Sequence, residues 1–108
     1  MSLTKHFKNS VVNRAKADSA FREAMLIEAV NSLLEGEIDT AKLMLRDYIN
    51  ATISFTPLAE KLNKNPKSLQ RMLGHKGNPT AKSLFEMLSV LQKTEGVHLS
   101  TTPCRDPC

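Results

Sequence analysis

The stretch LAEKLNKNPKSLQRML, residues 58–73, contains two short amphipathic segments separated by a polar joint. Asn63 is one of the few non-glycine residue types that tolerate the left-handed conformation of a tight helix end. Asn65 followed by Pro66 is an N-cap with proline at the first helical position, which marks a helix start. The pattern therefore predicts a helix that ends at Asn63 and a second helix that begins at Pro66.

The apolar residues of the two segments have the spacing of a helix-turn-helix. The first helix is expected over 55–62, with Ala59 as the small residue over which the second helix crosses. The second is expected over 66–73, ending at Gly74. The expected inward residues are Leu58, Leu62, Leu69, Met72 and Leu73.

The remaining side chains of the second segment suit the recognition of DNA bases. In a helix-turn-helix, this side of the second helix enters the major groove. Arginine and lysine donate to guanine O6 and N7, whereas glutamine and asparagine pair with adenine N6 and N7. The candidate base-contacting residues are Asn65, Lys67, Ser68, Gln70 and Arg71. The alternative is a solvated helix face, with Asn65 serving only as a cap.

A second set of residues is expected at the DNA backbone. Helix N-termini at Ser54 and Thr80 present N–H groups that can hold phosphates, and nearby lysines add attraction that weakens with salt. The candidate phosphate-contacting residues are Ser54, Lys64, Lys76, Asn78, Thr80 and Lys82. The lysines could instead serve solubility, and Asn78 could simply shape the turn before Pro79.

Charge is distributed unevenly along the chain, which carries a net charge of +4. Between residues 54 and 83 there are six Lys or Arg residues and one acidic residue, whereas residues 1–53 are balanced. A confined basic segment is typical of a protein that binds a polyanion. RNA is disfavoured, because the chain has one Tyr, four Phe and no Trp to stack on bases.

Helical spacing of apolar residues recurs through the rest of the chain, so the fold class is all-α. Helix starts are predicted at the capping residues Thr4, Asp18, Asp39, Ser54, Asn65 and Thr80. The helix after Thr4 carries Phe7, Val11 and Ala15, and the helix after Asp18 has a wide apolar stripe and stops near Gly36. The stripe is interpreted as core, with a partner surface as the alternative. A short strand is predicted over 97–99.

The last long helix is expected to bury the positions Ala81, Leu84, Phe85, Leu88 and Leu91. The helices that flank Gly36 are joined by a short connection, so they are expected to form an antiparallel hairpin. The domain organisation is predicted as an N-terminal helical segment over 1–38, a DNA-binding domain over 39–99 and a flexible tail over 100–108.

Other classes of function lack support in the residue pattern. No glycine loop, nucleophile motif or carboxylate pair suggests an enzyme, and no cofactor is expected. The three histidines are far apart and do not pair with the cysteines at zinc-ligand spacing, so no metal is expected. Cys104 and Cys108 are expected to be free thiols in a reducing, cytoplasmic setting, and no apolar run could span a membrane.

The residues LAEKLNKNPKSLQRMLGHKGNPTAKSLFEML, with the preceding LRDYINAT, resemble the phage-repressor (Cro/Xre-like) helix-turn-helix family. More narrowly, they are similar to small bacterial addiction-module antidotes, or antitoxins. Two positions depart from the family pattern. Phe55 stands where the family often has a phosphate-contacting Gln, and Lys64 stands where an apolar residue usually plugs the turn.

The resemblance covers about residues 39–95 and implies a lambda-repressor-like bundle with an N-terminal helical hairpin extension. It also implies a transcriptional regulator, usually a repressor, that binds double-stranded DNA as a homodimer. For the antitoxin branch it implies a cognate toxin protein as partner. The competing interpretation is a helical protein-interaction module whose basic patch is incidental.

Overall fold

The computed structural model describes residues 17–105 of the chain, and these residues form helices joined by short connections. The helices are α2 (Ser19–Leu34), α3 (Ile38–Ala51), α4 (Phe55–Leu62), α5 (Pro66–Met72) and α6 (Ala81–Glu95). No strand occurs within residues 17–105, so the all-α prediction is confirmed for this part. The helix predicted after Thr4 lies outside the described residues.

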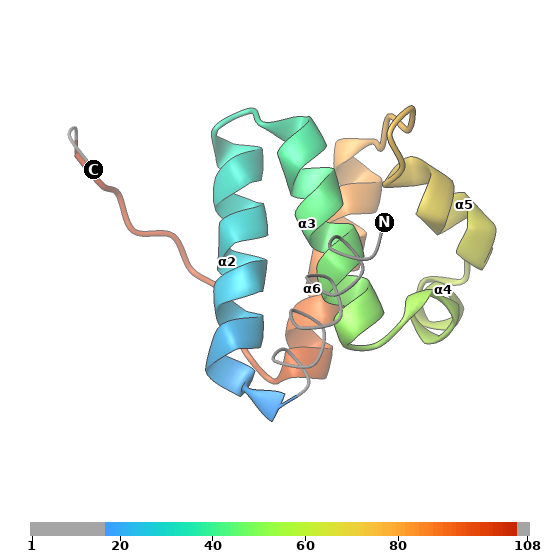
Figure 1. Cartoon of the computed structure of the whole chain (residues 1–108), viewed down its shortest axis with the longest axis horizontal. Helices are drawn as coiled ribbons and strands as arrows, with labels where there is room; N and C mark the ends of the chain where they lie inside the picture. The colour runs from blue at the N-terminus through green and yellow to red at the C-terminus, as the bar shows by residue number, and fades with distance from the viewer. Residues whose placement is uncertain (1–16, 106–108) are drawn as a thin grey trace, which may run out of the picture.

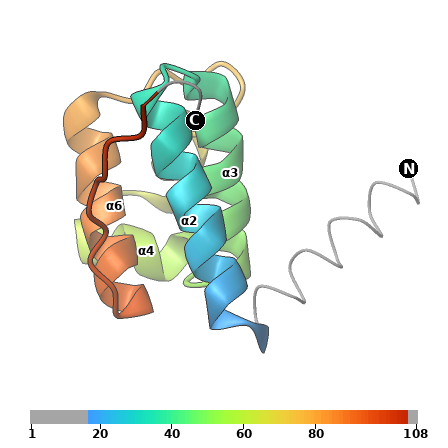
Figure 2. The ribbon, with the colours of Figure 1, turned by 90° about the vertical axis from the view of Figure 1, so that its left-hand side faces the viewer.

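Helices α2 and α3 form the antiparallel hairpin that the short connection at Gly36 predicts (Figure 1). Gly36 adopts a φ of +80°, a conformation that costs glycine little, and it lets the chain reverse directly after α2. Helix α4 contacts both α5 and α6. In Figure 2, α2 lies between α3 and α6, and α4 lies behind this layer.

Three of the predicted caps are confirmed as side-chain hydrogen bonds, and two are not. Asp18 accepts from the N–H groups of Ala20 and Phe21, and Thr80 accepts from Ser83. Asn65 accepts from Lys67. Asp39 is not the cap of α3, because this helix already begins at Ile38, and Ser54 holds its N-cap position without a side-chain hydrogen bond.

One hydrophobic core joins all of these helices. Leu26 and Ala29 of α2 belong to it, which shows that α2 packs against the elements that follow. Leu58, Leu69 and Leu73 are fully buried, as their spacing predicts. The core therefore fixes the crossing of α4 and α5.

Helix α6 buries a different set of positions from the one predicted. Leu84, Leu88 and Leu91 are buried as expected, and so is Met87. Ala81 is exposed, and Phe85 is 67% exposed, so burial of these two positions is wrong. The reason is geometrical: Met87 takes the inward position between Leu84 and Leu91 and turns Phe85 to the outer side.

The chain after α6 is extended and forms no strand, so the strand predicted at Val97–Leu99 is wrong. The N–H of Leu99 donates instead to Oε1 of Gln92, at 2.7 Å. The segment then runs beside α2 (Figure 2), where Ser100–Thr102 line a small hollow with Ile27 and Val30.

Cys104 lies farther along this segment and is disulfide-bonded, so the free thiol expected at this position is wrong. Cys108 lies outside the described residues. None of the helices within residues 17–105 has the length and apolar character that crossing a bilayer requires.

Candidate nucleic-acid interface

The joint between α4 and α5 has the geometry that its residues predict. Asn63 ends α4 in the left-handed conformation, with φ 58° and ψ 45°. The N–H of Lys64 then donates to the carbonyl of Ala59 at 2.9 Å, which satisfies one of the last acceptors of α4. Lys64 itself is exposed, so a charged residue is accommodated at this turn position. The chain thus turns within three residues and starts α5 at Pro66.

Helix α5 separates its apolar and polar residues cleanly. Leu69 faces the core with no exposed surface, and Leu73 directly after the helix does the same. The exposed side chains of the helix are Lys67, Gln70 and Arg71, and Met72 is half-buried.

The two other polar residues at the N-terminal end of α5 are less free than Lys67, Gln70 and Arg71. Ser68 is half-buried, and Asn65 is exposed while its Oδ1 accepts from the N–H of Lys67 at 2.8 Å. The amide nitrogen of Asn65 remains available to a ligand. The structure therefore brings the five predicted base-contacting residues together on one short helix and its cap, with Ser68 the least accessible.

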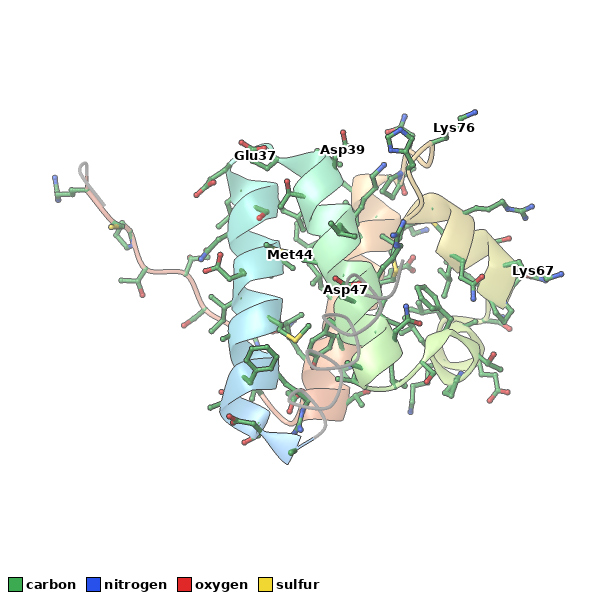
Figure 3. The ribbon with its side chains drawn as sticks, in the orientation of Figure 1. Glu37, Asp39, Met44, Asp47, Lys67 and Lys76 are labelled. Atoms are coloured by element: carbon green, nitrogen blue, oxygen red, sulfur yellow. The ribbon has the colours of Figure 1, made fainter. Side chains whose placement is uncertain are left out.

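Lysines extend this polar surface beyond α5. Figure 3 shows Lys67 and Lys76 projecting outward at the end of the molecule formed by α5 and the loop that follows it. Asn78, Thr80 and Lys82 continue from this loop into α6 and are exposed. The labelled acid Glu37 lies at the connection between α2 and α3 (Figure 3). Asp39, at the start of α3, lines a hollow together with His75 of the loop.

The two predicted anion-binding helix ends differ. Ser54 has a φ of +73°, and its own N–H donates to the carbonyl of Ile49 at 2.8 Å, so that group is not available to a phosphate. At α6, the hydroxyl oxygen of Thr80 accepts from the N–H of Ser83 at 3.1 Å, which uses one N–H of the first turn. The other N–H groups of these first turns remain as candidate donors.

A buried lysine holds the loop that carries Lys76. Lys42 on α3 is 4% exposed, and its Nζ donates to the carbonyl of Gly77 at 2.7 Å and to that of His75 at 3.4 Å. Asp39 neutralises it at 3.3 Å. Because the residues on both sides of Lys76 direct their carbonyls inward to Lys42, the side chain between them faces outward.

Helix α3 supplies a second cation to the end of α5. Nη1 of Arg46 donates to the carbonyl of Leu73 at 3.3 Å. A cation at a helix C-terminus interacts favourably with the helix dipole and satisfies a carbonyl that lacks a helical partner. Lys42 and Arg46 therefore attach both α5 and the following loop to α3.

Sequence reasoning missed these two cations. The signal was present for Lys42, which lies in the inward series with Ala41, Leu45 and Ile49. Its burial depends on carbonyl groups more than thirty residues away, and no local pattern reveals those.

Gly77 allows the close approach of this loop to α5. A Cβ at this position would lie 2.1 Å from the carbonyl oxygen of Arg71 and 2.3 Å from that of Met72. A Cβ at Gly74 would lie 3.3 Å from its nearest neighbour, the carbonyl oxygen of Arg71. The backbone of residue 77 thus packs directly on the last turn of α5, and only glycine fits there without a shift.

A polar network ties α2, α3 and α6 together away from this surface. The hydroxyl of Tyr48 donates to Oε1 of Glu95 at 2.6 Å, and Arg22 forms an ion pair with the same carboxylate at 3.1 Å. Burial, the hydrogen bond to Glu95 and the charge of Glu95 raise the pKa of Tyr48 well above its usual value. The three side chains line a hollow of about 270 Å³.

The rest of the described surface offers few groupings of chemically reactive side chains. Within residues 17–105, no three His, Cys, Asp or Glu side chains gather as metal ligands. A shallow apolar groove of about 210 Å³ lies between α2 and α3, lined by Ala24, Met25, Glu28, Met44 and Asp47. Figure 3 shows two of these residues, Met44 and Asp47, on α3. The chain matches no protein-family model, and no curated protein and no solved structure was found to match it.

Proposed function

We propose that this protein is a sequence-specific DNA-binding regulator. The observation that carries the proposal is the α4–α5 pair, in which a left-handed Asn63 makes a short joint and buried Leu69 and Leu73 turn the polar residues of α5 outward. In a helix-turn-helix this polar side enters the major groove. Arg71 and Lys67 would donate to guanine, and Gln70 and Asn65 to adenine.

The loop and the start of α6 would fix the register of the protein on the DNA backbone. Lys76 projects beside α5, and Asn78 and Thr80 follow it along the same exposed segment. Contacts of this kind position a protein on the duplex without reading its sequence. The regulator would act as a repressor by occluding a promoter, as a homodimer on two half-sites. Its role as an antitoxin with a cognate toxin rests on the resemblance of the helix-turn-helix residues alone.

Selection of bound duplexes from a random pool tests this proposal. The expected result is enrichment of a short motif with a conserved guanine opposite Arg71. An Arg71→Ala variant should then lose about 1–3 kcal/mol at that base step and relax the preference there. A Lys76→Ala variant should instead weaken binding to all sequences alike. A pool that shows no enrichment, or a motif that Arg71→Ala leaves unchanged, would contradict the assignment.

A second candidate function is that of a protein-interaction module. The observation that favours it is the apolar groove between α2 and α3, where Met25 and Met44 line a hollow with acidic Glu28 and Asp47. Methionine-lined grooves accept apolar side chains of partner helices. Failure of duplex binding at low salt, together with loss of a partner on Met44→Glu substitution, would favour this candidate.

A further inference from the structure

Phe85 is an exposed aromatic side chain on a helix that buries its leucines and its methionine. It is 67% exposed, whereas Leu84 and Leu88 beside it are buried. Ala81 and Ser89 lie one turn before and one turn after Phe85, and both are exposed. The outer face of α6 thus presents one large apolar ring between two small residues. The small residues leave room on both sides of the ring for the side chains of a second helix.

Two side chains of opposite charge lie along one side of this stripe. Lys82 and Glu86 each follow a stripe residue by one position, so both lie on the same side of it. Both side chains are exposed, and neither forms an ion pair with another residue of the described part. Figure 2 shows α6 at one edge of the bundle, with α2 and α3 on its other side.

We propose that the outer face of α6 binds the same face of a second copy of this chain, with the two helices antiparallel. A two-fold axis perpendicular to the helices and near Leu84 and Phe85 would place Lys82 beside Glu86 of the second copy. By symmetry, Glu86 would then face Lys82 of that copy. The two Phe85 rings would pack against each other near the axis, between the small residues Ala81 and Ser89.

The order of the charges selects this arrangement. In a parallel pair, the two-fold axis would run along the helices and would place this flank of the two copies on opposite sides of the interface, so Lys82 and Glu86 would not meet their counterparts. In the antiparallel pair, every cross-interface contact of these residues joins opposite charges. The inference deepens the proposed function, because it rests on the homodimer expected there and identifies its surface. It also assigns Lys82 to a carboxylate of the second copy in place of a phosphate.

Sedimentation equilibrium of the full chain without DNA, from micromolar to millimolar concentrations, tests the surface. The expected result is a monomer–dimer equilibrium whose dissociation constant rises at least about tenfold in Phe85→Glu. Leu34→Glu is the matched control, because Leu34 on α2 is 68% exposed and should not affect the dimer. A wild-type protein that remains monomeric, or a Phe85→Glu variant that dimerises as the wild type does, would overturn the inference.

A charge-reversal pair gives a readout that misfolding cannot imitate. Lys82→Glu and Glu86→Lys should each dimerise more weakly than the wild type, because each creates like-charge contacts across the axis. An equimolar mixture should recover dimers, since the heterodimer again joins opposite charges. A mixture no more dimeric than its separate components would contradict the arrangement. Loss of duplex binding with dimers intact would overturn the proposed DNA binding alone. Duplex binding by a monomer would overturn this inference and the homodimer on which it rests, and would leave DNA binding itself in place.

Discussion

At the scale of single residues, Tyr48 links protonation to stability. It is buried, and its hydroxyl donates to Glu95, which also holds Arg22. Because the native state raises the pKa of this group, the native state holds the phenolic proton at pH values where the unfolded chain has lost it. The stabilising contribution of the neutral phenol is therefore complete below about pH 10 and is lost as the pH rises beyond that value.

The expected outcome is a fall in the free energy of unfolding above about pH 10, with a contribution from Tyr48 of up to about 1.4 kcal/mol per pH unit. Urea unfolding of the wild type and of Tyr48→Phe, compared at each pH, isolates this contribution. Tyr48 is the only tyrosine of the sequence, so phenolate absorbance reports it directly. Titration of the native protein near the ordinary tyrosine pKa would contradict the account.

Gly77 is a second residue whose role follows from local geometry. Gly77→Ala would place Cβ against backbone carbonyls at 2.1 and 2.3 Å, and backbone cannot move aside as a flexible side chain can. We expect a loss of about 1–3 kcal/mol in the free energy of unfolding.

Gly74→Ala is the control for this substitution, since its nearest contact is 3.3 Å and requires only a small shift. It should cost clearly less than Gly77→Ala in chemical denaturation. Equal stability of the two variants would show that the loop does not pack on α5 as described.

At the scale of elements, α3 acts as the support of α5 and of the loop after it. Lys42 reaches two loop carbonyls, and Arg46 reaches the carbonyl of Leu73. Removing the ammonium group while keeping the apolar stem would leave the carbonyls of His75 and Gly77 without this part-buried donor. Loss of such a hydrogen-bond donor costs about 1–3 kcal/mol.

Lys42→Met should therefore destabilise the protein by about 1–3 kcal/mol and speed amide exchange in the loop over 75–79. Lys93→Met is the control, because Lys93 is exposed on α6. If chemical denaturation and hydrogen exchange gave the same result for both variants, the attachment of the loop to α3 would not be important.

The sequence predicted the joint between α4 and α5 better than the burial pattern of α6. Asn63 and the Asn65-Pro66 pair are local signals, so the joint between α4 and α5 and the start of α5 were predicted correctly. Phe85 was misplaced because α6 carries apolar residues on more than one side, and only packing against the other helices selects Met87 as the inward one. The exposure of Lys67, Gln70 and Arg71 was predicted, but their contact with DNA remains a prediction.

At the scale of the whole molecule, the basic excess of residues 54–83 falls on α4, α5, the loop and the start of α6. The acids Glu28 and Asp47 line the groove between α2 and α3, which is a separate surface. Because its basic residues and these acids lie on different surfaces, the protein would approach a duplex with α5 and the loop foremost, where the phosphates attract the lysines.

The affinity of the wild-type protein for its selected duplex, measured against salt concentration by fluorescence anisotropy, shows whether this side of the molecule binds the phosphates of DNA. Each phosphate neutralised by a lysine or arginine should contribute a slope of about −0.9 to the logarithm of affinity against the logarithm of salt concentration. We expect a total slope steeper than about −2 for each protomer, from contacts such as those of Lys64 and Lys76. No duplex binding at low salt, or an affinity that salt does not change, would contradict it.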